Sequence, residues 1–274
     1  MLTALPPLTP FGGSSRLYDG PVEVGDIEAV LDRFRAGLVP LVQPVALWAH
    51  GSLAMGDFQP GRSDLDLIAV LDEPLSETQI AELTRLHQEL DRDEAAAMLH
   101  CSYMRRDQVS DHDVRHFTWA HREVLARPVT VVTHRELQQA GRVLHGAAPA
   151  AILPPVSDDE LNAFIRTDLR DYWLPHTDLS APWRKDIWVD LGMLTYARAV
   201  VTLREGRLTT KAQALDELVS LGAPAKVVAD IRTRRYGESA QPGYLWRKRR
   251  GAQVRHYLGA GIRRVLADAG TAAA

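Results

Sequence analysis

The sequence predicts an α/β domain followed by an all-helical domain, and three observations support this fold class. Short apolar runs at about 45–50 and 65–71 have the length of buried strands. Segments with apolar residues at helical spacing surround them. Beyond the proline-containing stretch at about 146–157, we find only helices. We therefore predict a flexible arm, a mixed-sheet α/β domain and a helical bundle, at residues 1–24, 25–150 and 151–274.

The elements of the α/β domain follow from local patterns. Residues 25–38 carry Ile27, Val30, Leu31 and Phe34 at helical spacing. Ser76 caps a second helix, and residues 97–104 read as a third strand. From Pro128 the run PVTVVTHREL predicts a fourth strand, followed by a helix that Thr133 and Glu136 open as a capping box.

The helical domain begins with another capping box, formed by Ser157 and Glu160. A long apolar helix follows in DIWVDLGMLTYARAVVTLREG. Three further helical segments complete the predicted bundle: KAQALDELVSLG, PAKVVADIRTRRYG and GYLWRKRRGAQVRHYLGAGIRRVLADAG.

Composition limits the classes of function. The 274 residues are 46% apolar and 24% charged, with a net charge of −3, as in ordinary globular proteins. The single cysteine excludes an internal disulfide, and no signal peptide or membrane span is predicted. We expect a monomeric cytoplasmic protein without membrane contact. The C-terminal basic residues lack an RNA-binding motif, so we do not expect a nucleic-acid partner.

Gly51-Ser52 and the run Ser63-Asp64-Leu65-Asp66-Leu67 form the most informative motif. Alternate residues of a strand share a face, so Asp64 and Asp66 present two carboxylates side by side. Adjacent carboxylates repel unless a cation lies between them, and oxygen ligands suit Mg²⁺. Gly51 allows the backbone to approach a phosphate closely. The combination predicts a nucleoside triphosphate bound through Mg²⁺.

This motif resembles the signature of the polymerase-β-like nucleotidyltransferases: Gly-Ser, a spacer of about ten residues, and two aspartates alternating with apolar residues. The whole layout resembles the aminoglycoside (3″)(9) adenylyltransferases, which adenylylate streptomycin and spectinomycin. The resemblance extends from about residue 40 to about residue 240. It implies ATP as co-substrate and Mg²⁺ as cofactor.

The same resemblance assigns residues to the site. Gly51 and Ser52 would hold the terminal phosphates, and Asp64 and Asp66 the metal. Arg198 and Lys211, spaced about Gly206 as in the family, would contact the ATP phosphates, and Tyr236 would contact the adenine. The residues that would face the antibiotic are Trp119, Trp173, Asp178 and Asp186. From the sequence, Trp119 and Trp173 could equally be core residues, and Asp186 could equally be an exposed charge on a helix.

One position departs from the family. The adenylyltransferases carry a glutamate on the neighbouring strand as general base, and its place here is occupied by His100. Three interpretations remain. His100 is the base, since imidazole suits proton transfer at neutral pH; or the chain binds ATP without efficient transfer; or a carboxylate such as Glu123 arrives from elsewhere.

The sequence therefore predicts an Mg²⁺-dependent enzyme that transfers AMP from ATP to a hydroxyl of a small polar acceptor. An aminoglycoside-like acceptor and a role in antibiotic resistance are the specific expectation. The alternative is a weak or inactive relative that only binds nucleotide or antibiotic. A second alternative, a nucleotidyltransferase that modifies proteins, is disfavoured by the large helical domain.

Overall fold

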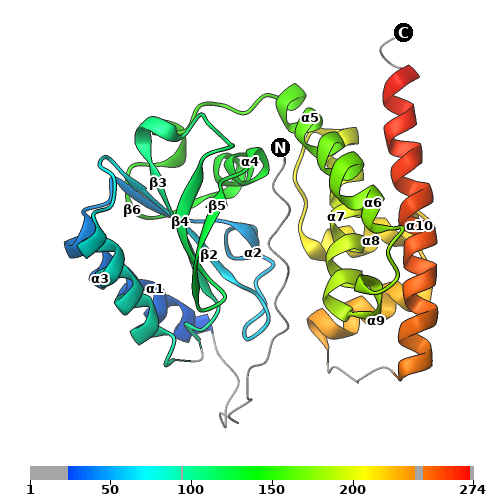
Figure 1. Cartoon of the computed structure of the whole chain (residues 1–274), viewed down its shortest axis with the longest axis horizontal. Helices are drawn as coiled ribbons and strands as arrows, with labels where there is room; N and C mark the ends of the chain where they lie inside the picture. The colour runs from blue at the N-terminus through cyan, green and yellow to red at the C-terminus, as the bar shows by residue number, and fades with distance from the viewer. Residues whose placement is uncertain (1–23, 94, 238–242, 272–274) are drawn as a thin grey trace. The chain divides into compact units, whose positions relative to one another are not determined.

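A computed structural model describes residues 24–93, 95–237 and 243–271 of the chain (Figure 1). The chain divides into two compact units, of which one is Pro21–Leu161 and the other includes Asn162–Ala274. Nearly all of the predicted arm at 1–24 lies outside the described residues. The predicted domain boundary at 150 remains a prediction.

The first unit alternates strands and helices. In chain order its elements are α1 (Val24–Val42), β1 (Ala46–Ala49), α2 (Gly51–Ala54), β2 (Leu65–Leu71), α3 (Glu77–Leu90), β3 (Leu99–Arg105), η1 (Arg106–Gln108), β4 (Arg115–Ala120), β5 (Glu123–Pro128), α4 (Val131–Ala140), β6 (Arg142–Gly146) and η2 (Pro149–Ala151).

The six strands form one sheet in the order β5-β4-β3-β2-β1-β6. β2 and β3 are parallel, whereas the other neighbouring strands are antiparallel. The connection between the two parallel strands runs through α3, as parallel pairing requires a crossover. The predicted mixed sheet is confirmed.

Alternation along β2 divides the core between the two faces of the sheet. Leu65 and Leu67 pack with residues of α1 and α3, such as Phe34 and Leu83. Residues of the opposite parity, such as Ile68, pack with α4 on the other face. Figure 1 shows α1 and α3 side by side along one face. Asp66 has the parity of Ile68, so its carboxylate belongs to the α4 face.

The predicted fourth strand from Pro128 is wrong. Residues 131–140 form α4, and its N-cap is Thr130, whose hydroxyl accepts from the Thr133 amide. Two strands that the sequence did not predict, β4 and β5, precede it. In contrast, the Ser76 cap of α3 and the Ser157–Glu160 capping box are confirmed.

The second unit is helical throughout its described part, as predicted. Its elements are α5 (Asp158–Asp168) from Asn162 on, the π-helix η3 (Leu169–Trp173), α6 (Leu174–His176), η4 (Pro182–Arg184), α7 (Asp186–Glu205), α8 (Lys211–Ser220), α9 (Ala225–Tyr236) and α10 (Tyr244–Thr271).

The apolar helix α7 is the centre of this unit. Its buried residues include Val189, Met193 and Ala197. α10 packs closely on it, because a Cβ at Gly261 would lie only 2.4 Å from the Tyr196 hydroxyl. None of the described helices is long and apolar enough to cross a membrane.

Candidate functional site

Gly51 lies at the sharp turn between β1 and α2, directly against Asp66. Its φ of +62° is in the left-handed region that favours glycine. A Cβ at this position would lie 2.7 Å from Asp66 Oδ2. The amide of His50 donates to the Asp66 carbonyl at 2.9 Å, which fixes the turn against β2. The backbone conformation therefore favours glycine here, and a larger residue would also crowd the Asp66 carboxylate.

The pairing of β2 with β3 brings His100 next to Asp66. The parallel register matches Asp66 with His100, so their side chains share the face of the sheet that α4 covers. Asp64 precedes the first residue of β2 and has the same parity. Two adjacent strands thus deliver all three side chains to one place.

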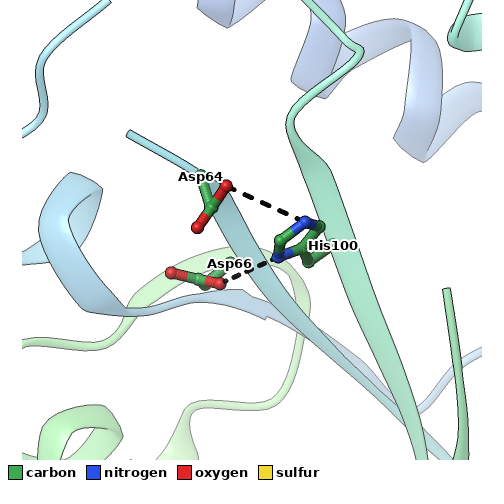
Figure 2. A group of neighbouring side chains, drawn as sticks. All are labelled: Asp64, Asp66 and His100. Atoms are coloured by element: carbon green, nitrogen blue, oxygen red, sulfur yellow. Dashed lines mark ion pairs between the residues drawn. The ribbon is translucent and has the colours of Figure 1, made fainter. Parts of the chain in front are cut away.

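Asp64, Asp66 and His100 converge within metal-binding range of one another (Figure 2). His100 Nε2 lies 3.8 Å from Asp64 Oδ1, and His100 Nδ1 lies 3.7 Å from Asp66 Oδ1. One ligand atom from each residue falls within 4.8 Å of the others. The carboxylates are 40% and 34% exposed, but the imidazole only 11%. Within the described ranges this is the one such group of three.

The hairpin of β4 and β5 adds a second imidazole to this site. His121 and Arg122 form its two-residue turn, both with positive φ, of 55° and 64°. The His121 ring lies 4.6 Å from the His100 ring, edge to face. Partial burial lowers the pKa of His121 to about 4, and the charges of His100 and Arg127 act in the same direction. His121 is therefore neutral at physiological pH.

Two further charged groups that the sequence did not predict surround the site. Burial lowers the pKa of Arg127 on β5, whereas the charges of Asp66, Asp64 and Glu123 oppose this shift. Burial raises the pKa of Asp91, at the end of α3, to about 6 against the charges of Arg122 and His100. Arg127 and Asp91 therefore interact electrostatically with residues of the site, but neither belongs to the group of Asp64, Asp66 and His100.

His50 and Glu136 form a buried pair beside Asp66. His50 Nδ1 lies 3.3 Å from Glu136 Oε2. Burial would lower the pKa of His50, but the hydrogen bond to Glu136 and the charges of Asp66 and Glu136 raise it overall. The pair joins β1 to α4. Only the tertiary fold brings these two residues together, so sequence spacing gave no signal of it.

The donor set suits a divalent cation. Two carboxylates this close repel each other, and a cation bound between them would relieve the repulsion; Asp64 and Asp66 are open enough to solvent for an ion to enter. Mg²⁺ is usually held by one or two carboxylates. The imidazole of His100 is a nitrogen donor, which is more typical of transition metals.

In the helical unit, Arg198 on α7 lies beside the start of α8. Its Nε donates to the Thr209 carbonyl at 2.9 Å. Lys211 is the first residue of α8, which Thr210 and Gln213 open with a capping box. Gly206, between them, ends α7 in the left-handed conformation. The fold therefore brings Arg198 and the segment that bears Lys211 together.

Tyr236 ends α9, and its ring is contacted by Arg235. The Arg235 guanidinium carbon lies 5.4 Å from the ring centroid, and Arg235 Nε donates to the Tyr236 hydroxyl at 3.1 Å.

The four residues predicted for the acceptor have different environments. Trp119 is only 2% exposed and stacks on His87 at 5.1 Å, and Trp173 is 4% exposed. Asp178 is exposed. Asp186 accepts from the fully buried Arg250 at 2.5 Å, and Arg234 bridges it to Asp190. Asp186 thus serves a buried charge network.

Comparisons with known proteins agree with this fold. Residues 31–145 match the family model described as "Nucleotidyltransferase domain". The chain is similar to the crystal structure of spectinomycin adenyltransferase AAD(9) from Enterococcus faecialis with ATP and spectinomycin. The TM-score is 0.66 at 14% sequence identity, over 86% of this chain and 99% of that chain.

No curated protein matches the sequence. The likeness to the solved structure establishes a shared fold, and the family match establishes a nucleotidyltransferase domain. The shared fold is the one expected from the predicted resemblance to the aminoglycoside adenylyltransferases.

Proposed function

Since residues 31–145 form a nucleotidyltransferase domain, we propose that the protein transfers AMP from ATP to a hydroxyl of a small, polar, aminoglycoside-like acceptor. The observation that carries the proposal is the convergence of Asp64, Asp66 and His100 beside the Gly51 turn. The solved structure of similar fold contains ATP and spectinomycin, which supports this choice of donor and acceptor.

Asp64 and Asp66 would hold a divalent cation. When bound, such a cation neutralises charge on the phosphates and favours departure of pyrophosphate. By holding the cation, the two carboxylates would orient the triphosphate relative to the acceptor. Gly51 and Ser52 lie at the turn next to Asp66, where the terminal phosphates would bind.

In the transfer itself, the acceptor hydroxyl oxygen bonds to the α-phosphorus of ATP, and the bond from that phosphorus to the bridging oxygen of pyrophosphate breaks. The hydroxyl proton passes in the same step to His100 or, where His100 binds the metal, to solvent water. Two roles are open to His100, acceptor of that proton or ligand of the metal, and in both Asp64 and Asp66 remain the centre of the site.

The helical unit would supply the remaining groups. We propose that Arg198 and Lys211 neutralise the phosphates and that Tyr236 contacts the adenine. Our proposed acceptor residues remain Trp119, Trp173, Asp178 and Asp186. Asp178 is the most accessible of them, because the two tryptophans are buried and Asp186 is paired with Arg250. We further propose a monomeric, cytoplasmic enzyme that confers antibiotic resistance.

Pyrophosphate release tests the proposal. The protein is incubated with ATP and either Mg²⁺ or Mn²⁺, and with streptomycin, spectinomycin and other aminoglycosides in turn. We expect release with at least one acceptor and an acceptor mass increased by one AMP. The Asp64→Asn variant is the matched control and should release none. ATP binding without release for any acceptor would instead support the binding-only alternative.

A further inference from the structure

We propose that His100 is the third ligand of the metal and that the site consequently prefers Mn²⁺ to Mg²⁺. The inference deepens the proposed function and rests on it only for the presence of a divalent cation. In this proposal, the replacement of the expected glutamate by His100 changes which metal the site binds, and His100 does not act as the base.

The orientation of the ring favours a ligand over a base. Both nitrogens of His100 face the aspartates, Nε2 toward Asp64 and Nδ1 toward Asp66, at 3.8 and 3.7 Å (Figure 2). A general base must direct a nitrogen lone pair at the acceptor hydroxyl. A cation held between these carboxylates would instead lie within reach of an imidazole nitrogen.

The position of His100 is also fixed. Its side chain is 11% exposed on β3, and the strand register sets it beside Asp66. The His121 ring packs edge to face against it. The sequence of β3, LHCSYMR, contains no carboxylate that could replace it. A constrained donor on a strand makes a more precise ligand than one on a loop.

The donor set then decides the metal. Mg²⁺ takes oxygen ligands in octahedral geometry and loses its water reluctantly. Imidazole suits metals such as Zn²⁺, Fe²⁺ and Ni²⁺, and carboxylates suit Mg²⁺ and Mn²⁺. Mn²⁺ is itself a transition metal and shares the octahedral preference of Mg²⁺. A set of two carboxylates and one imidazole therefore matches Mn²⁺ best among the metals that bind nucleotide phosphates.

Pulsed electron paramagnetic resonance of the Mn²⁺-loaded full-length protein tests direct ligation. We expect coupling of the electron spin to a directly bound ¹⁴N nucleus in the unmodified protein. The coupling should disappear in His100→Glu and persist in His121→Gln, which removes the neighbouring ring. Bound Mn²⁺ without nitrogen coupling in the unmodified protein would overturn the proposal, as would coupling that survives in His100→Glu.

Calorimetric titration with MnCl₂ and MgCl₂ tests the preference. We expect Mn²⁺ to bind the unmodified protein at least about tenfold more tightly than Mg²⁺, and the ratio to fall several-fold in His100→Glu, which restores an oxygen donor. Circular dichroism verifies folding, and Ser102→Ala, on the same face of β3, is the matched control. An equal ratio in the unmodified protein and His100→Glu, or no binding of either metal, contradicts the inference.

Failure of this inference is distinguishable from failure of the proposed function. Metal binding through His100 without pyrophosphate release would leave the ligand assignment intact and refute the transferase. Pyrophosphate release, together with metal binding that is unchanged in His100→Glu, would support the transferase and refute the ligand assignment.

Discussion

Replacement of the buried histidine His134 tests the electrostatics of the α/β unit away from the metal site. His134 on α4 is 1% exposed, and neither ring nitrogen has a hydrogen-bond partner in the described part of the chain. Its ring lies 4.5 Å from that of His112. Burial lowers the pKa of His134 to about 4, and the charges of His112 and His116 reinforce the shift.

The sign follows from linkage. The folded pKa of His134 lies below its unfolded value of 6.5, so the unfolded state binds more protons between these values. The cost to stability is absent above about pH 6.5 and grows as the pH falls toward 4. At about pH 5 it amounts to roughly 2 kcal/mol, from 1.36 kcal/mol per unit of pKa shift.

The variant His134→Leu removes this titration without breaking a hydrogen bond. Urea unfolding at about pH 7.5 and about pH 5 measures the free energy of unfolding of both proteins. We expect the variant to gain about 2 kcal/mol relative to the unmodified protein on going to the lower pH. The half-exposed His145→Leu is the control. Equal pH dependence in the unmodified protein and His134→Leu would refute the reasoning.

Three further substitutions test the site and its support. Gly51→Ala should destabilise the protein by about 1–3 kcal/mol in thermal unfolding and weaken Mn²⁺ binding in titration, because the methyl group meets Asp66 at a positive φ; unchanged metal affinity would contradict this. Asp64→Asn should lose most metal affinity by calorimetry while its circular dichroism stays the same. Asp186→Ala should cost about 3 kcal/mol in urea unfolding, because it leaves the buried Arg250 unpaired; an unchanged stability with a raised KM for the acceptor would instead assign Asp186 to substrate binding.

The sequence predicted those strands and helices whose apolar pattern and capping residues match the way they pack in the fold. β2 is an apolar strand interrupted only by Asp66, it lies between a loop and a capped helix, and residues 65–71 form it as predicted. The aspartates share the face that alternation required. The same parity argument and the β2–β3 register account for His100 beside Asp66.

The β4–β5 hairpin was missed because its turn carries no turn signal. Two-residue hairpin turns usually contain Asn or Gly, which tolerate positive φ. Here His121 and Arg122 adopt that conformation, at a cost of order 1 kcal/mol each. The strands that flank them contain Arg, His and Glu as well as apolar residues. Tertiary pairing with β3 therefore determines this hairpin, and local preference does not.

The pairs His50–Glu136 and Asp186–Arg250 were equally invisible in sequence. Their members are far apart in the chain and are brought together only by packing of α4 and α10. Asp186 illustrates the consequence. A carboxylate near the start of a helix reads as exposed, but the buried guanidinium of Arg250 gives it a structural partner.

The charge of the proposed metal site differs from that of a site with three carboxylates. The site contains two carboxylates, Asp64 and Asp66, whose charge one divalent cation balances, whereas a third carboxylate would leave an excess negative charge. A balanced site repels the triphosphate of ATP less, and the nearby guanidinium of Arg127 reduces the repulsion further. Compared with a third carboxylate, the imidazole of His100 attracts the cation less by charge but can form a nitrogen–metal bond. His100→Glu should accordingly shift the balance in both respects: metal selectivity moves toward Mg²⁺, and ATP binds more weakly until a second cation accompanies it.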